Sequence, residues 1–169
     1  YNRRTDKYGG NWENRLRATV ETVDKVRQSV GKDFPVLVRF CGDQLIGDKG
    51  ITVEDTMRYI VPALDEAGVD AFDVSQGDNI RSVEGISIPM YIPRGAFIYV
   101  AAAAKKATKK PVMGVGRIVD IEMAERFLQE GKADLVFMSR QFTADPETPK
   151  KFLAGKPEEG EAAAHVWDF

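Results

Sequence analysis

The sequence predicts an α/β protein of the TIM (β/α)8-barrel type, of which these 169 residues would provide four parallel strands with their helices. Short β-branched segments alternate with helical segments, which is typical of parallel strands joined by right-handed crossovers. A polar or glycine position also ends each predicted strand, and barrels build their sites at the carboxyl ends of strands. A doubly wound sheet allows the same alternation, but no Gly-x-Gly-x-x-Gly follows the first strand. Because a barrel needs eight strands in about 250 residues, we expect half a barrel.

The first predicted element is a helix that begins after Asn11. Gly9 and Gly10 mark a turn, Asn11 is a good N-cap, and Gly31 ends the helical pattern. The apolar residues have the spacing of one buried helical stripe. They are Leu16, Val20, Val23, Val26 and Val30.

A strand and a second helix follow. Residues 34–40 form the β-branched run FPVLVRF, which predicts a strand over about 35–40. After a glycine-rich loop, residues 52–68 have a helical pattern that Thr52 can cap, with Asp55 three residues on. Pro62 should kink or shorten this helix, because proline removes a backbone donor.

The rest of the chain alternates in the same way. In chain order, the predicted elements are a strand at 70–75, a long loop, a helix at 96–109, a strand at 111–115, a helix at 120–131 and a strand at 134–138. Asp120 would cap the second of these helices. Asp145 and Pro146 would start one more short helix.

Composition narrows the class of protein. The net charge of −2 gives no basic field for a nucleic-acid partner, and the single cysteine, Cys41, fits a reducing compartment. No apolar run approaches the roughly 20 residues that span a bilayer, and the first residues do not resemble a signal peptide. Acidic residues show no metal-ligand spacing, and His165 is the only histidine. We expect a cytoplasmic protein with no metal site and no membrane or nucleic-acid partner.

The last two predicted strands end in residues suited to binding an anion. Gly114, Gly116 and Arg117 end one, and Ser139 with Arg140 ends the next. Glycines let backbone N–H groups approach an anion, and a guanidinium adds charge and paired donors. The loops after the seventh and eighth strands of barrels frequently bind phosphate. Alternatively, the glycines only permit tight turns and the arginines pair with nearby acidic residues.

Arg39 is unusual because it lies in the apolar strand VLVRF. A charge facing the core is costly unless it is paired. Arg39 therefore either forms a buried salt bridge, for example with Asp73, or points at a cavity mouth and meets an anionic or electron-rich ligand. Ser75 and Gly77 end the neighbouring strand, and Cys41 could line the same mouth.

The opening segment, YNRRTDKYGGNWENRLR, closely resembles the N-x-R-T-D-x-Y-G-G-S-x-E-N-R signature of the old yellow enzyme family, in the branch that includes 2,4-dienoyl-CoA reductase and trimethylamine dehydrogenase. Asn11 stands where serine is usual, and both are N-caps. The likeness continues over about residues 1–159. It implies that the four strands match the fifth to eighth strands of an FMN-binding barrel.

The resemblance also implies roles for individual residues. Arg39 matches the arginine beside the flavin N1–C2=O edge, where a fixed cation stabilises negative charge on the reduced ring. Gly114, Gly116 and Arg117 match the phosphate loop after the seventh strand, and Ser139 with Arg140 match the one after the eighth. Ser75 and Gly77 match a turn near the ring. NAD(P)H would be the electron donor, and an activated alkene, an enoyl-CoA or an amine would be the substrate.

No residue of this sequence matches the catalytic residues of the family. Its His pair or His/Asn pair and its proton-donating Tyr would precede residue 1, so we assign no catalytic residue. We expect residues 1–155 to be the C-terminal half of the barrel and 156–169 a divergent tail without cysteines, which does not support an iron–sulfur cluster. A fragment of this kind should self-associate or join its missing half. Alternatively, it is a catalytically incomplete scaffold that only binds phosphate or itself.

Overall fold

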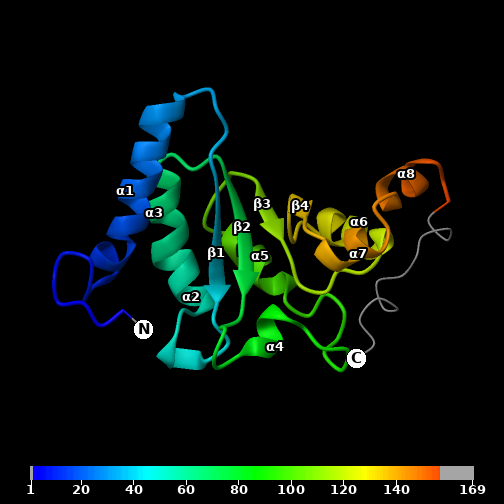
Figure 1. The fold of residues 1–169 in the computed structure, drawn as a ribbon, viewed down its shortest axis with the longest axis horizontal. Coiled ribbons are helices and arrows are strands. Elements are labelled where there is room, and N and C mark those ends of the chain that lie inside the picture. Colours follow the sequence, from blue (N-terminus) through cyan, green and yellow to red (C-terminus); the bar gives the residue numbers. More distant parts are fainter. Residues whose placement is uncertain (1, 157–169) are drawn as a thin grey trace.

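A parallel four-stranded sheet forms the centre of the computed structural model, which describes residues 2–156 (Figure 1). Its strands lie side by side in chain order: β1 (Leu37–Asp43), β2 (Ala71–Gln76), β3 (Val112–Gly114) and β4 (Leu135–Val136). All three neighbouring pairs are parallel. Parallel strands in sequential order are the arrangement of consecutive barrel strands, so the predicted fold class is confirmed.

The helices pack beside and behind this sheet (Figure 1). In chain order they are α1 (Trp12–Val30), a 3-10 turn (Gly47–Lys49), α2 (Val53–Asp55), a π-helical turn (Thr56–Ile60), α3 (Val61–Glu66), α4 (Val83–Ile86), α5 (Ile98–Lys105), α6 (Ile121–Gln129), α7 (Ser139–Ala144) and α8 (Thr148–Leu153). Helix α5 packs against β1, β2 and β3, and α1 lies along α3.

Helix α1 has the predicted caps but only part of the predicted buried stripe. The Asn11 side chain accepts from the N–H of Asn14, and Gly31 follows the last turn. Val23 is buried, whereas Val26 and Val30 are 40% and 39% exposed. The helix rests on the π-helical turn and α3, and its last turns extend past α3 in Figure 1. The periodicity therefore predicted more burial than the described residues provide.

The helical stretch after β1 is continuous through the proline. Thr52 and Asp55 form a capping box at its start, as the sequence indicated. Pro62 was expected to kink or shorten this helix, but helical structure continues to Glu66. The π turn ends at Ile60, two residues before the proline, and the N–H of Val61 donates to the carbonyl of Thr56. Because Pro62 cannot donate, a wider turn at this point lets the backbone continue.

Several predicted boundaries were wrong. β1 begins two residues after Pro35 because the N–H of Val36 donates to the Asp70 carboxylate, and β4 has only two residues because the chain turns into α7. Helices α4 and α7 were not predicted. Helix α8 starts at Thr148, not at Asp145, whose buried carboxylate accepts from the N–H of Glu147.

The two faces of the sheet differ. One face packs against the helices and carries the core, including Phe72, Val74 and Val112, each at most 1% exposed. Residues of alternate parity point to the other face, where Leu37 is 52% and Leu135 is 46% exposed. A sheet that is covered on one side is what half of a barrel presents, because the inner face of a complete barrel packs against its other strands.

The described residues contain no helix that is both long enough and apolar enough to cross a membrane. The expected divergent tail, 156–169, lies outside the described part of the chain except for Lys156, and so does His165.

Candidate functional site

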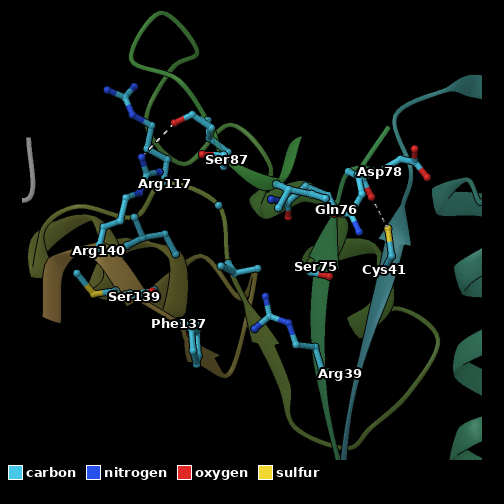
Figure 2. A pocket seen from close by; sticks show the side chains of 18 of the residues that line it. Arg39, Cys41, Ser75, Gln76, Asp78, Ser87, Arg117, Phe137, Ser139 and Arg140 are labelled. Carbon is cyan, nitrogen blue, oxygen red and sulfur yellow. Dashed lines mark hydrogen bonds between the residues drawn. The ribbon is translucent and has the colours of Figure 1, made fainter. Parts of the chain in front are cut away.

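A cavity of about 780 Å³ lies at the carboxyl ends of the four strands (Figure 2). The loops that follow β1, β2 and β3, the start of α7 and the 86–88 segment line it. Of the eight predicted site residues, seven border this cavity: Arg39, Ser75, Gly77, Gly116, Arg117, Ser139 and Arg140. Residues from four different parts of the sequence therefore meet where the barrel prediction placed them.

Gly114 is the predicted site residue that does not line the cavity. It is buried inside β3, and a Cβ built on it would lie 2.5 Å from Cδ1 of Ile98 and 3.1 Å from Cβ of Ala101. Its missing side chain lets α5 approach the sheet. Gly114 therefore packs between the sheet and α5, whereas Gly116, two residues later, lines the cavity.

Arg117 and Arg140 lie close together at one end of the cavity (Figure 2). Arg117 donates to the carbonyl of Ile92, and Arg140 Nη1 donates to the carbonyl of Ile88 at 3.1 Å. Both guanidiniums are therefore held by the segment between β2 and α5. Among the described residues, no carboxylate pairs with either of them.

The electrostatics at this end favour an anion. Burial lowers the pKa of Arg117, and the positive charges of Arg94 and Arg140 lower it further. Arg94 is 3.8 Å from the Asp120 carboxylate, whereas Arg117 and Arg140 contact carbonyls only. Partly buried guanidiniums that repel one another are stabilised by a bound anion, which they can bind with paired N–H donors.

The backbone at this end is also specialised. Arg117 has φ +55°, an uncommon value for a residue with a side chain, and Gly116 before it has φ +138°. A Cβ on Gly116 would lie 3.1 Å from the Cβ of Phe97, so the turn is both left-handed and closely packed. Ser139 and Arg140 occupy the first turn of α7. Together, these turns place Arg117, which follows β3, and Arg140, which follows β4, at the same end of the cavity.

Arg39 reaches the cavity from β1 in the middle of the site (Figure 2). Its Nη1 is 2.9 Å from Asp73 Oδ2, and its guanidinium lies over the Phe137 ring at 5.3 Å from the centroid. The salt bridge that the sequence suggested is therefore present, but only its Asp73 end is largely buried: the Asp73 side chain is 13% exposed and the Arg39 side chain 51%. Arg39 both pairs with Asp73 and lines the cavity.

The turn after β2 is fixed by α4. The hydroxyl of Ser75 donates to the carbonyl of Phe40 at 3.1 Å, and the Gln76 amide donates to the carbonyl of Gly85 at 2.7 Å. Gly77 has φ +90°, and a Cβ there would lie 2.7 Å from the carbonyl carbon of Gly85. Only glycine permits this approach.

Cys41 lines the same cavity as a thiol that links two strand ends. Its Sγ lies within hydrogen-bonding distance of two carbonyls, those of Asp43 at 3.3 Å and Gly77 at 3.2 Å, which share its one S–H donor. Burial raises the pKa of the Cys41 thiol, and the nearby charges of Asp43 and Asp78 add to this effect. A protonated thiol is a poor nucleophile, and the contacts of Cys41 join the end of β1 to the turn after β2.

Sequence reasoning missed Phe137 and the lining residues on the segment between β2 and α5, which contains α4. The missed residues of this segment include Asp78, Asn79, Ile86, Ser87 and Ile88. This segment shows neither helical nor strand periodicity, so only its position after a parallel strand could have indicated a role.

The fold and the cavity define one side of an α/β barrel, with cationic side chains at the strand ends around one cavity. The chain belongs to the NADH:flavin oxidoreductase / NADH oxidase family, whose model matches residues 1–159. The resemblance to the old yellow enzyme family is therefore confirmed.

Individual relatives agree with this family. The chain is 39% identical to an NADH oxidase of Thermoanaerobacter brockii, over 94% of this chain and 24% of that protein. It is 38% identical to a metal reductase of Desulforamulus reducens, over 94% of this chain and 23% of that protein. Among solved structures, it resembles a 2-naphthoyl-CoA reductase in complex with 2-naphthoyl-CoA, with a TM-score of 0.87, 32% identity and coverage of 96% of this chain and 24% of that chain.

A morphinone reductase in complex with tetrahydroNAD has the same fold over this region. The TM-score is 0.65 and the identity 26%, over 92% of this chain and 38% of that chain. The chain thus spans about a quarter of the length of the two curated relatives named above.

Proposed function

We propose that this chain supplies the flavin-phosphate side of an FMN-dependent NAD(P)H oxidoreductase of the old yellow enzyme type. The observation that carries the proposal is the corner formed by Arg117, Arg140 and Gly116. It combines two guanidiniums without carboxylate partners among the described residues with a left-handed glycine turn. This chemistry fits a phosphate monoester better than a neutral ligand.

The rest of the cavity fits the other parts of FMN. Arg39 lies away from the phosphate corner, where a fixed cation would stabilise negative charge on the flavin ring. Ser75 and Gly77 would border the ring, and the cavity of about 780 Å³ is within the usual range for cofactor sites. When bound, FMN would supply hydride-transfer chemistry, while these residues bind and orient it.

The substrate class follows from the relatives and not from a residue of this chain. Named relatives include a cinnamate reductase, a 2-naphthoyl-CoA reductase and a dimethylamine dehydrogenase. An activated alkene, an enoyl-CoA or an amine is therefore the proposed substrate, and NAD(P)H the proposed electron donor. We assign neither a catalytic residue nor an iron–sulfur cluster to these residues, and we propose a cytoplasmic setting.

A comparison of FMN with riboflavin tests the proposal in the protein that contains this chain. The two ligands share the ring and differ in the phosphate, so FMN should bind at least about tenfold more tightly if charge-assisted contacts hold the phosphate. Fluorescence quenching measures both affinities. Equal affinities, or no binding of either flavin, would contradict the proposal.

A second candidate function rests on the open face of the sheet. Leu37, Leu135 and Phe137 are 52%, 46% and 40% exposed there, and β1 and β4 are edge strands. Such a surface favours association. Without the rest of a barrel, the chain would be a phosphate-binding or self-associating scaffold that has no oxidoreductase activity. Inorganic phosphate binding without flavin binding would favour this second function.

A further inference from the structure

Asp73 combines an ion pair with an unsatisfied buried oxygen. It lies on the open face of β2, directly opposite Arg39 of β1 and Met113 of β3. Its Oδ2 accepts from Arg39 Nη1 at 2.9 Å. Its Oδ1 is buried and has no hydrogen-bond partner within the described residues. Only one of the two carboxylate oxygens of Asp73 is therefore hydrogen-bonded within the described residues.

Stability does not explain a carboxylate at this position. The Asp73 side chain is 13% exposed, and burying a charged group with one oxygen unpaired is costly. An apolar residue would pack on this face at lower cost, as Ala71 and Met113 do nearby. A locally unfavourable residue next to a cavity indicates a role in the site.

Arg39 gains a fixed position from Asp73. An arginine side chain that is 51% exposed has many rotamers, and holding it in one of them carries an entropic cost. Asp73 binds the guanidinium from β2, and Phe137 stacks against it from the segment after β4. The cation is therefore held from two elements while it lines the cavity (Figure 2).

We propose that Asp73 is a positioning residue for Arg39. It holds the guanidinium at the cavity, and its negative charge reduces the positive field that Arg39 exerts on a ligand there. The second statement rests on the proposed function, in which Arg39 faces the flavin ring. Asp73 would then set how strongly Arg39 stabilises negative charge on that ring.

Two substitutions separate position from charge. Asp73→Asn removes the charge but keeps an oxygen that can accept from Arg39, whereas Asp73→Ala removes both. Asp70→Asn is the matched control, because Asp70 also accepts from an arginine, Arg27, but lies at the opposite end of β2 and outside the cavity. General destabilisation would affect the control as well.

The first readout needs no flavin. Arginine side-chain ¹⁵N NMR should show Arg39 restrained in the wild type, Asp73→Asn and Asp70→Asn. In Asp73→Ala, where only the Phe137 contact remains, Arg39 should be clearly more mobile. An unchanged Arg39 signal in Asp73→Ala would overturn the positioning role. This result holds whether or not the protein binds FMN, so it separates this inference from the proposed function.

The second readout is the reduction potential of bound FMN. Asp73→Asn should shift it to a more positive value, because a negative charge near the ring is removed while Arg39 stays in place. Arg39→Gln should shift it in the opposite direction, and Asp70→Asn should leave it unchanged. A potential in Asp73→Asn that stays at the wild-type value or becomes more negative would overturn the charge effect.

Discussion

Arg117 is the residue on which the anion site most depends. Its φ of +55° directs the side chain toward the cavity, where the carbonyl of Ile92 fixes it. The sequence indicated this arginine because it follows a glycine turn after a parallel strand. The sequence could not indicate the carbonyl that orients it, which belongs to a segment 25 residues earlier. Local pattern identifies a donor, whereas its orientation depends on a long-range contact.

Arg117→Ala should weaken FMN binding in the protein that contains this chain. Loss of one charge-assisted contact reduces the binding free energy by roughly 1.5–3 kcal/mol, or about 10- to 100-fold in Kd. Equilibrium dialysis with FMN measures the change. Arg58→Ala is the control, because Arg58 is exposed beside Tyr59 and lies outside the cavity. Similar FMN affinity in both variants would contradict the phosphate assignment.

Tyr99 should make the stability of the fold depend on pH in the alkaline range. Burial, together with the hydrogen bond that its hydroxyl donates to Asp43 Oδ2 at 2.9 Å, raises the pKa of Tyr99 from 10.0 to about 12. A raised folded-state pKa gives stability that is complete below pH 10 and is lost as the pH approaches 12. The free energy of unfolding should therefore fall less in Tyr99→Phe than in the wild type across this interval, as urea titrations would measure. An equal fall in both proteins would show that Tyr99 does not carry the effect.

At the scale of elements, the π-helical turn links the outer helix to the strand end that borders the site. Thr56 is fully buried in this turn, and its hydroxyl donates to the carbonyl of Gly42 at 2.7 Å. Gly42 follows Cys41 in β1, and a Cβ on it would lie 2.6 Å from Cγ1 of Val74. The end of β1 is thus held between a hydroxyl and tight core packing.

Thr56→Val should destabilise the fold by roughly 1–3 kcal/mol, because valine keeps the shape but leaves the buried Gly42 carbonyl unsatisfied. Thr22→Val is the matched control: the Thr22 hydroxyl donates to the Ala18 carbonyl at 2.7 Å on the exposed side of α1. Chemical denaturation monitored by circular dichroism measures both. Equal destabilisation in the two variants would show that burial of this hydrogen bond is unimportant.

Element boundaries were less predictable than element order. Caps gave the correct starts at Asn11, Thr52 and Asp120, because each side chain bonds a neighbouring N–H of its own helix. Helix α4 has only four residues and is held by the Gln76 amide, so no local periodicity predicts it. Local hydrogen bonds can be read from the sequence, but short elements that depend on distant partners cannot.

At the scale of the whole molecule, the unusual feature is a sheet with one covered face. The strand alternation predicted four parallel strands, and the family signature predicted which part of a barrel they match. The exposed half of helix α1 could not be predicted, because periodicity shows which face of a helix is apolar and not how much of it is covered. The same limit applies to the sheet, where the apolar side chains of Leu37 and Leu135 lie exposed.

The 169-residue chain, studied alone, should associate through this open face. Burying a leucine contributes about 1.5–3 kcal/mol, so Leu135→Lys should raise the dissociation constant of the self-associated species about tenfold or more. Leu153→Lys is the control, since Leu153 is 84% exposed on α8, away from the sheet. Sedimentation velocity over a range of concentrations measures both. A monomer at every concentration would show that the open face does not bind itself. If the chain associates and Leu153→Lys weakens association as much as Leu135→Lys does, the contact surface is not the open face of the sheet.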